Sequence, residues 1–416
     1  MPQQMKDSRI EWIGNIPDSW NTIKFKYLHN GMNTGEGIDK NFWSDELADR
    51  PFYTAGLNPI RTSYDGFPEW KYTSENDLLL ARNGTPYVYL PIPNACYTDH
   101  IIRVSMKKGI NRRYIQYSLQ RSIAAVVVDS VSLATWSASL WNEQVIAWPS
   151  LDEQEKIVGY LDKQCTHIDS VLKKTRNSIE EYKKLKQAVV SQAVTKGVRG
   201  ERAMKDSEVE WLGNIPADWN VYRIANLYDE RSESGLEELP ILTVSINTGV
   251  SDHEIADEDK DRVFVRSEDR TKYKRVYPGD LAYNMMRAWQ GAFGAVRVDG
   301  MVSPAYVVAK PKKNVKLDSR YMEALLRTSE ATEEMHRYSR GIVDFRLRLY
   351  WPEFKNIRIC LPPIAEQIEI ADYIDEKSAA IDALIAKKEA FAAELENYKK
   401  SMIYEYVTGK KEVPQS

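Results

Sequence analysis

Residues 151–197 read LDEQEKIVGYLDKQCTHIDSVLKKTRNSIEEYKKLKQAVVSQAVTKG, and residues 364–410 read IAEQIEIADYIDEKSAAIDALIAKKEAFAAELENYKKSMIYEYVTGK. The two stretches align without a gap at an offset of 213 residues, as between Gln154 and Gln367. Identical or similar residues recur along the alignment, at Ile157/Ile370, Tyr160/Tyr373, Leu161/Ile374, Asp162/Asp375, Ile168/Ile381, Asp169/Asp382, Lys186/Lys399 and Val194/Val407. The chain therefore contains one segment twice, and the rest of the sequence is organised around it.

Both copies have the periodicity of a long amphipathic helix. In the first copy, apolar or small residues recur at alternating steps of three and four with Lys and Glu between them, which is the spacing of a coiled-coil seam. The predicted seam comprises Leu161, Ile168, Leu172, Ile179 and Tyr182, and in the second copy Ile374, Ile381, Ile385, Leu395 and Tyr398. Because a long helix with one apolar face needs a partner, we expect the copies to pack on each other as an antiparallel coiled coil. The alternative is that each helix lies on a globular core.

Composition bounds the class of protein. A chain of 416 residues has room for two or three domains of about 150 residues each. Hydrophobic residues make up 43% of the chain, with 24 Tyr and 11 Trp, which is ample for globular cores. The formal net charge is −3, so a nucleic-acid partner has to be inferred from local clusters of basic residues.

The cysteines and the hydropathy indicate the compartment. Cys96, Cys165 and Cys360 lie far apart and form no C-x-x-C pair, so they fit neither a zinc site nor a disulfide framework. No signal peptide opens the chain, and no apolar run approaches the roughly 18 residues that cross a bilayer. We therefore expect a cytoplasmic protein without a membrane partner.

A second duplication opens each repeat. The sequence MKDS at residues 5–8 recurs at 204–207, and EWIGNIP at residues 11–17 recurs as EWLGNIP at 210–216. The offset here is 199 residues, as between Met5 and Met204, so the second copy has gained 14 residues in its middle. A repeat of about 200 residues is far too long for a solenoid. The interpretation is a duplicated domain, each copy followed by a helix.

This repeat predicts the domain boundaries and the fold class. We expect a first domain at residues 1–150, a first helix at 151–199, a second domain at 200–363, a second helix at 364–412 and a tail at 413–416. Short apolar runs between Gly, Pro and Asn turns predict strands at 77–80, 87–90 and 101–104 and at 279–283, 292–296 and 305–308, with helices at 113–119 and 320–326. The fold class is α+β, with two mostly-β or mixed domains, two long helices and a pseudo-two-fold internal repeat.

The two domains share this order of elements but little sequence, whereas the helices and the opening motifs retain their residues. Within one chain, that contrast favours a scaffold that presents two different binding surfaces. The alternative is that globular domains simply diverge faster than long helices.

Local clusters of basic residues are the first candidates for DNA contacts. They include Arg103, Lys107, Lys108, Arg112 and Arg113 in the first domain, and Arg275, Lys312 and Lys313 in the second. Such clusters can neutralise phosphates, which supply much of the affinity for nucleic acid. The alternative is an ordinary solvated surface.

Base recognition requires side chains such as Arg, Asn, Gln, Ser or Thr on loops that reach a groove. The candidates are Arg82, Asn83, Thr85, Thr135 and Trp136 in the first domain, and Arg287, Trp289, Gln290, Arg340 and Arg346 in the second. Each has a structural alternative, since Trp136 or Trp289 can equally cover a core.

Motifs for catalysis are missing from the sequence. It contains neither the Asn/Asp-Pro-Pro-aromatic motif expected of a base methyltransferase nor a G-x-x-x-x-G-K-[S/T] nucleotide loop. The five histidines are scattered, so no metal cluster or catalytic triad suggests itself. We therefore expect no catalytic residue, no metal and no cofactor bound by this chain.

Four motifs together resemble the specificity subunit of a type I restriction–modification system. They are the W-x-G-N-I-P opening, the strand at Gly279-Asp280-Leu281, the helix start Leu361-Pro362-Pro363-Ile364-Ala365-Glu366-Gln367 and the Val-Thr pair near the helix end. The resemblance covers the full chain, twice in the same order. The first helix start, at residues 147–154, departs from the Leu-Pro-Pro form.

This resemblance implies two target recognition domains joined by two conserved helical regions that form an antiparallel coiled coil. Each domain would read one half of an asymmetric, bipartite DNA sequence, and the coiled coil would set the spacing between the halves. The subunit would have no catalysis of its own. Its partners would be double-stranded DNA, two methyltransferase subunits that use S-adenosylmethionine, and two motor-nuclease (restriction) subunits that use ATP and Mg²⁺.

Helix length agrees with this picture, because about 46 residues span roughly 70 Å and one turn of DNA is about 34 Å. The competing interpretation is a coiled-coil adaptor whose domains bind proteins instead of DNA. A fused enzyme is disfavoured by the missing motifs.

Overall fold

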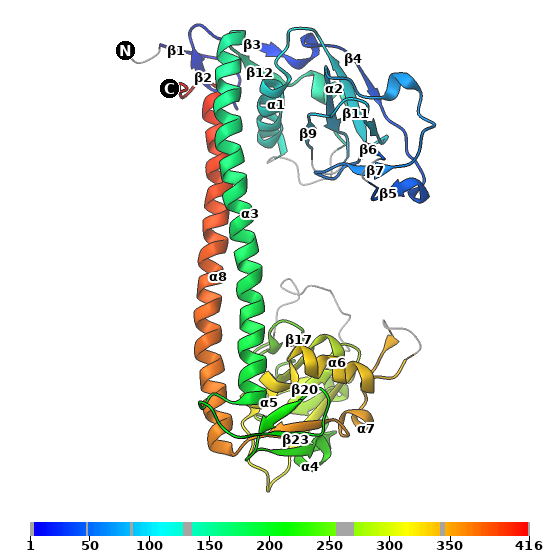
Figure 1. Cartoon of the computed structure of the whole chain (residues 1–416), viewed down its shortest axis with the longest axis vertical. Coiled ribbons are helices and arrows are strands. Elements are labelled where there is room, and N and C mark those ends of the chain that lie inside the picture. The colour runs from blue at the N-terminus through cyan, green and yellow to red at the C-terminus, as the bar shows by residue number, and fades with distance from the viewer. Residues whose placement is uncertain are drawn as a thin grey trace. The chain divides into compact units, whose positions relative to one another are not determined.

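The computed structural model describes residues 4–46, 49–83, 86–127, 135–254, 270–341 and 346–414 (Figure 1). The chain divides into two compact units, Met1–Arg176 with Ala390–Ser416, and Asn177–Glu389. Each unit contains one globular domain and a part of each of the long helices α3 (Leu151–Lys196) and α8 (Ile364–Val407). The division differs from a domain-helix-domain-helix order because each part of the helix pair shares a hydrophobic core with one domain.

The first domain is built on a four-stranded antiparallel sheet of order β4-β11-β8-β9. Its strands and helices are β1 (Met5–Asp7), β2 (Asn15–Pro17), β3 (Asn21–Lys24), η1 (Phe25–Tyr27), β4 (His29–Thr34), η2 (Lys40–Phe42), β5 (Trp43–Ser44), β6 (Arg50–Tyr53), β7 (Ile60–Thr62), η3 (Glu69–Lys71), β8 (Asp77–Ala81), β9 (Val88–Tyr89), β10 (Cys96–Tyr97), β11 (Ile101–Met106), α1 (Arg112–Val127), α2 (Ala138–Asn142) and β12 (Val145–Trp148). A second sheet has the order β10-β6-β7-β5, and β1-β2 and β3-β12 form two-stranded sheets.

The second domain repeats this plan, with an antiparallel sheet of order β16-β23-β20-β21. Its elements are β13 (Met204–Asp206), β14 (Asn214–Pro216), β15 (Asn220–Arg223), α4 (Ile224–Leu227), β16 (Tyr228–Arg231), β17 (Val244–Ser245), β18 (Gly249–Val250), η5 (Arg270–Lys272), β19 (Lys274–Val276), β20 (Leu281–Asn284), η6 (Ala288–Gln290), β21 (Phe293–Ala295), β22 (Gly300–Val302), β23 (Tyr306–Pro311), α5 (Ser319–Leu326), α6 (Ser329–Tyr338), α7 (Trp351–Phe354) and β24 (Arg358–Leu361). The predicted α+β class and internal repeat are confirmed.

The strands predicted from apolar runs are the two central strands and one edge strand of each main sheet, β8, β11 and β9 in the first domain and β20, β23 and β21 in the second. Strand β8 is buried along its whole length and pairs with β11, and β20 pairs with β23 in the same way. A strand buried on both faces reads as a continuous apolar run, which explains why these segments stood out in the sequence. Helices α1 and α5 follow, as predicted.

In the first unit, α3 and α8 run antiparallel. The ammonium of Lys399 lies 2.6 and 2.7 Å from the two carboxylate oxygens of Asp169, and the rings of Tyr160 and Tyr406 lie 4.6 Å apart between centroids. Low numbers on α3 thus face high numbers on α8.

In the second unit, α3 supplies the lysine of the equivalent ion pair and α8 supplies the aspartate. The ammonium of Lys186 lies 2.6 Å from Asp382 Oδ2, and Lys388 lies over the ring of Tyr182. This ion pair is the counterpart of Lys399 with Asp169 at the repeat offset, so each copy of the segment supplies one lysine and one aspartate. The predicted antiparallel packing is therefore confirmed within each unit.

Nine of the ten residues predicted for the seam are buried or half-buried. Leu161, Ile168, Leu172, Ile179, Ile374 and Ile381 are buried, and Tyr182, Ile385 and Leu395 are half-buried. Tyr398, in contrast, is 58% exposed. The covered positions of α8 continue in steps of four and three through Ile385, Lys388, Ala392, Leu395, Lys399 and Met402. Tyr398 is therefore one residue out of phase, and the stem of Lys399 occupies the seam instead.

Each domain is tied to the long helix of the other repeat by an equivalent contact. The buried hydroxyl of Tyr114 lies 2.8 Å from the carbonyl oxygen of Ala147 and 3.2 Å from that of Val407, at the end of α8. The buried hydroxyl of Tyr321 lies 3.2 Å from the carbonyl oxygen of Cys360 and 3.1 Å from that of Val194, at the end of α3. A tyrosine in each domain thus joins its last strand to the helix of the other repeat.

The arginine directly before each of these tyrosines adds a second tie, to the long helix of the same repeat. Arg113 Nε donates to Asp162 at 2.7 Å, and Arg320 Nη1 contacts Asp375 at 3.0 Å. The aspartates are one of the pairs that recur at the repeat offset. Among the described residues, none of the helices is long and apolar enough to cross a membrane.

Candidate nucleic-acid interface

Two candidate segments of the first domain, distant in sequence, meet at the end of β8. The backbone N–H of Trp136 donates to the carbonyl oxygen of Arg82 at 2.7 Å, and the N–H of Arg82 donates to the carbonyl of His100 at 2.8 Å. The side chains of Asn83 and His100 are also bonded, with Nδ2 of Asn83 2.6 Å from Nδ1 of His100. Arg82 and His100 are exposed, so polar groups from three segments share one surface.

An ionised carboxylate borders the same surface. The hydroxyl of Thr98 donates to Asp99 Oδ1 at 2.7 Å and holds the pKa of that carboxyl below its usual value, with smaller contributions from His100 and Arg82. The surface therefore offers both hydrogen-bond donors and acceptors, which base recognition requires.

Trp136 is a correction to the sequence-based expectation. Its side chain is buried and packs on Trp141 at 5.2 Å between ring centroids, so it belongs to the core and cannot stack on a base. Thr135, immediately before it, is exposed. Thr85 lies outside the described residues.

The second domain has an equivalent junction at the end of β20. The backbone N–H of Leu349 donates to the carbonyl oxygen of Met285 at 2.8 Å, which corresponds to the bond from Trp136 to Arg82. Just before Leu349, the backbones of Arg340 and Arg348 exchange two hydrogen bonds of 2.9 Å. The structure therefore brings the two candidate loops of this domain together as well.

The candidates on these two loops differ in exposure. Arg287 and Trp289 are half-buried beside the exposed Gln290, and Trp289 Nε1 donates to the carbonyl of Met286 at 3.2 Å. Arg340 and Arg346 are exposed, and the guanidinium of Arg340 pairs with Glu353 at 2.5 Å. The indole of Trp289 thus stabilises the turn, while the arginines and Gln290 provide the donors.

Several basic residues of the predicted clusters have structural roles. Arg112 Nη1 donates to the carbonyl of Asp77 at 2.7 Å, and burial lowers its pKa. Lys107 Nζ donates to the carbonyl of Tyr27 at 2.8 Å, and Lys312 Nζ to that of Ala225 at 2.6 Å. These side chains satisfy backbone acceptors inside the domains.

The remaining cluster residues differ from one another. Lys108 and Lys313 are exposed, each on the turn that follows a strand of the main sheet. Arg275 is half-buried, with its guanidinium 4.6 Å from the ring of Tyr277. Lys108 and Lys313 therefore have the exposure that a phosphate contact needs.

A buried aspartate fixes the start of the strand that leads to each candidate loop. Asp77 Oδ2 accepts from the N–H of Ser74 at 2.6 Å, and Asp280 Oδ2 accepts from the N–H of Tyr277 at 3.0 Å. Burial raises the pKa of Asp280, and the guanidinium of Arg231 at 2.8 Å opposes that shift. The loops therefore extend from strands whose starts are fixed in the same way.

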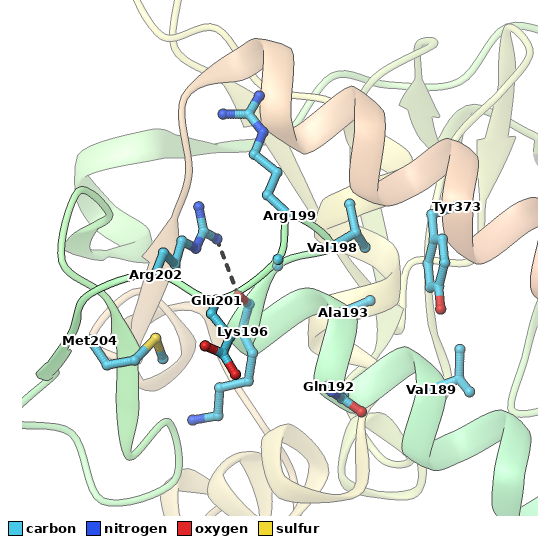
Figure 2. Close-up of a pocket in the computed structure, with 12 residues that line it drawn as sticks. Val189, Gln192, Ala193, Lys196, Val198, Arg199, Glu201, Arg202, Met204 and Tyr373 are labelled. Atoms are coloured by element: carbon cyan, nitrogen blue, oxygen red, sulfur yellow. Dashed lines mark hydrogen bonds between the residues drawn. The ribbon is translucent and has the colours of Figure 1, made fainter.

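A cavity of about 640 Å³ opens where α3 continues into the second domain (Figure 2). Its lining combines Val189, Ala193 and Tyr373 with the charged side chains of Lys196, Arg199 and Arg202. Arg202 Nη2 lies 2.6 Å from Glu366, and Arg199 makes two bonds of 2.8 Å with Glu369. The guanidinium groups beside the cavity are thus already paired with carboxylates of α8.

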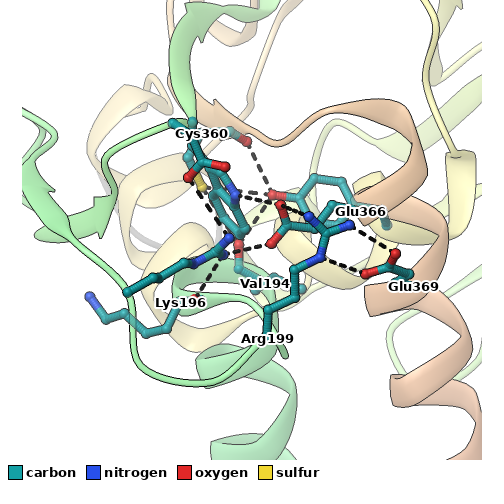
Figure 3. Close-up of polar contacts among 10 residues, drawn as sticks. Val194, Lys196, Arg199, Cys360, Glu366 and Glu369 are labelled. Atoms are coloured by element: carbon teal, nitrogen blue, oxygen red, sulfur yellow. Dashed lines mark hydrogen bonds and ion pairs between the residues drawn. The ribbon is translucent and has the colours of Figure 1, made fainter.

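Glu366 is the centre of this network (Figure 3). Its side chain is fully buried, and it accepts from Trp219 Nε1 at 3.1 Å in addition to its pairing with Arg202. The equivalent residue in the first repeat is Glu153, which accepts from Trp20 Nε1 at 3.1 Å and from the N–H of Ser150 at 3.1 Å.

The two long helices begin with different capping interactions. Ser150 and Glu153 bond reciprocally and form a capping box, which fixes the start of α3 at Leu151. Pro363 takes the place of Ser150 in the second repeat and cannot cap through its side chain. Arg202 and Trp219 hold Glu366 there instead.

Comparisons with known proteins bear on this architecture. No protein-family model matches the chain. It is 24% identical over 360 residues to the MjaVIII specificity subunit of a type I restriction enzyme from Methanocaldococcus jannaschii, covering 81% of this chain and 79% of the relative. It is 22% identical to the EcoBI specificity subunit from Escherichia coli over an alignment of 445 positions, covering 96% of this chain and 88% of the relative.

A solved structure of the type I restriction–modification system contains a chain that matches with a TM-score of 0.65 at 13% identity, covering 95% of this chain and 99% of that one. The resemblance to type I specificity subunits is confirmed. This similarity to specificity subunits extends over nearly the whole chain, so both repeats and both long helices are included.

His100, Asp99 and Arg202 were not among the residues that the sequence singled out as candidates for a functional site. His100 directly precedes a predicted strand that pairs with the strand before Arg82, so pairing of those strands would have placed it beside the loop. No pattern in the sequence indicated Arg202. It lies in the irregular segment after α3, and only the folded chain brings its side chain to Glu366 of α8. Among the described residues, no group of three or more His, Cys, Asp or Glu side chains is placed to hold a metal ion.

Proposed function

We propose that this chain is the DNA-binding specificity subunit of a type I restriction–modification complex and that each globular domain reads one half of a bipartite target. One observation carries the proposal. In both domains the central strand ends in a loop held by an equivalent backbone bond, Trp136 to Arg82 and Leu349 to Met285. The exposed residues around these bonds are different, and unlike surfaces on equivalent frames suit an asymmetric target.

The chemistry of the two surfaces supports DNA as the ligand. Exposed Arg82 and the Asn83 amide in one domain, and Gln290 and Arg346 in the other, belong to the side-chain types that read base edges in the major groove. Lys108 and Lys313 are exposed and suited to phosphate contacts, which fix the position of a protein on the duplex without specifying sequence.

Partner subunits belong to the proposal as well. We infer two methyltransferase subunits that use S-adenosylmethionine and two motor-nuclease subunits that use ATP and Mg²⁺. In the first unit, helix α8 exposes Phe391 and Tyr398 at a spacing of seven residues, with 47% and 58% of their surfaces accessible. An exposed apolar stripe at helical spacing supports contact with another protein.

The test is selection from a pool of random DNA duplexes by the full chain, purified alone and after co-expression with the type I methyltransferase subunit of its host. We expect enrichment of two separated blocks of defined sequence. Failure to enrich any sequence in either preparation would favour an adaptor that binds only proteins. Because the net charge is −3, the salt dependence of binding should steepen when the methyltransferase is present.

Arg287→Ala is expected to weaken recognition of one half-site only. If the guanidinium makes a bidentate contact to guanine, its loss costs about 1–3 kcal/mol at one base position. Arg346→Ala is expected to affect the same half-site. Competition binding against duplexes with single substitutions in each block measures the effect.

Lys313→Ala is the matched control for these two variants. An exposed lysine that contacts phosphate should weaken binding equally for all sequences and reduce the salt slope by about one. A uniform loss for Arg287→Ala as well would assign that arginine to phosphate and not to a base.

A further inference from the structure

Asn83 and His100 form a side-chain pair on the surface of the first domain. Nδ2 of Asn83 lies 2.6 Å from Nδ1 of His100. An amide nitrogen can only donate, so in this pair Nδ1 of the imidazole is the acceptor. The bond therefore fixes which way the Asn83 amide is turned.

The backbone on both sides holds this pair in place. The N–H of Arg82 donates to the carbonyl of His100, which joins the end of β8 to the start of β11. The carbonyl of Arg82 accepts from Trp136, whose indole is buried. Asn83 thus extends from a rigid strand end, and pre-organisation of this kind reduces the entropy lost on binding.

We propose that Asn83 reads an adenine in the major groove and that His100 is the residue that positions its amide. The inference rests on the proposed function, because it names one base contact made by the first domain. After donating one N–H to His100, the amide retains its second N–H and its carbonyl oxygen. Within the described parts of the chain, Oδ1 of Asn83 has no hydrogen-bond partner.

The remaining donor and acceptor match adenine. Oδ1 accepts from the N6 amino group, and the second N–H donates to N7, which is the bidentate arrangement by which asparagine recognises adenine. Guanine presents acceptors at both of these positions, so Oδ1 would meet O6 without a hydrogen. Pairing of Nδ2 with Nδ1 of His100 holds the amide in the orientation that suits adenine.

The second domain differs at the same place. The residue after Met285 is Met286, which is 42% exposed, and the position equivalent to His100 is Ala305, as the pairing of β20 with β23 shows. An exposed methionine offers apolar contact only. The adenine preference therefore belongs to the half-site that the first domain reads.

The test is selection from random duplexes by the full chain, with wild type and Asn83→Asp compared. A carboxylate accepts hydrogen bonds but does not donate, so it favours the N4 amino group of cytosine. We expect one adenine in one block to be replaced by cytosine, with the preference for adenine at that position falling about 5- to 150-fold. The other block should remain unchanged, which also shows that the variant is folded.

Two variants of His100 test the positioning role. His100→Ala removes the acceptor and should reduce the preference for adenine at the same position. In His100→Asn, the side-chain oxygen takes the place of Nδ1, so the preference should return.

The outcomes distinguish failure of the Asn83 base contact from failure of the proposed function. If wild type selects two blocks and Asn83→Asp selects the same two, the pair is only a brace of the loop and this inference is overturned. Equal losses in His100→Ala and His100→Asn would overturn the role of His100. If wild type selects no sequence, the proposed function fails, and the base contact fails with it.

Discussion

Replacing Glu366 by alanine is expected to destabilise the unit Asn177–Glu389 by about 3 kcal/mol. The carboxylate is fully buried, and its removal takes away the acceptor of the Trp219 indole N–H and the nearest carboxylate of Arg202. Arg202 then keeps the carbonyl of Lys196 at 3.1 Å and Asp218 at 3.8 Å. Breaking a buried ion pair costs about 3–5 kcal/mol. The lower end applies because the Arg202 side chain is 18% exposed and retains some contact with water.

Hydrogen exchange of the full chain measures this effect where it arises. Amide protection should fall between Val194 and Arg202 and in the first turns of α8, because Glu366 joins these segments. Urea unfolding followed by tryptophan fluorescence, to which the neighbouring Trp219 contributes, provides the free energy. Glu366→Gln keeps an acceptor for Trp219 but loses the charge, so an intermediate effect is expected.

The chain supplies its own control in Glu153→Ala. Glu153 occupies the equivalent position, but it forms an exposed capping box with Ser150 and one bond to Trp20. Losing a capping interaction costs about 1 kcal/mol. Equal effects of the two substitutions would show that the arginines contribute nothing beyond the capping position.

The long helices were predictable because periodicity depends only on local spacing. Asp169 and Lys186 recur as Asp382 and Lys399, which indicated a repeat but not which residues pair. The structure pairs each lysine with the aspartate of the other copy. Sequence identifies the face of a helix that needs a partner, whereas the register comes from contacts across the helix pair.

The candidate site was predictable only by residue type. Arg82 and Trp136 were both proposed, yet nothing local indicated that their backbones would bond or that the Trp136 side chain would be buried. Arg112 had the charge of a phosphate ligand, but its guanidinium bonds to the carbonyl of Asp77 inside the domain. Long-range contacts decide whether an arginine is structural or exposed, and a single sequence does not contain them.

Leu161→Ala is expected to destabilise the unit formed by Met1–Arg176 and Ala390–Ser416 by about 2–5 kcal/mol. The Leu161 side chain is fully buried and belongs to a core that includes Tyr114 of the domain and Tyr406 of α8. Removing it leaves a cavity where domain and helices meet, and the surrounding side chains can collapse only partly. Urea unfolding of the full chain measures the change.

Tyr398→Ala is the control that tests the phase of the seam. Simple extension of the apolar pattern placed Leu161 and Tyr398 in the same interface, but Tyr398 is 58% exposed. Substitution of an exposed residue away from a packed contact changes stability by less than about 0.5 kcal/mol. Since Tyr398 removes more side-chain volume than Leu161, volume alone predicts the opposite order. A larger loss for Tyr398→Ala would place Tyr398 in the seam and would contradict the register given by the Lys399–Asp169 pair.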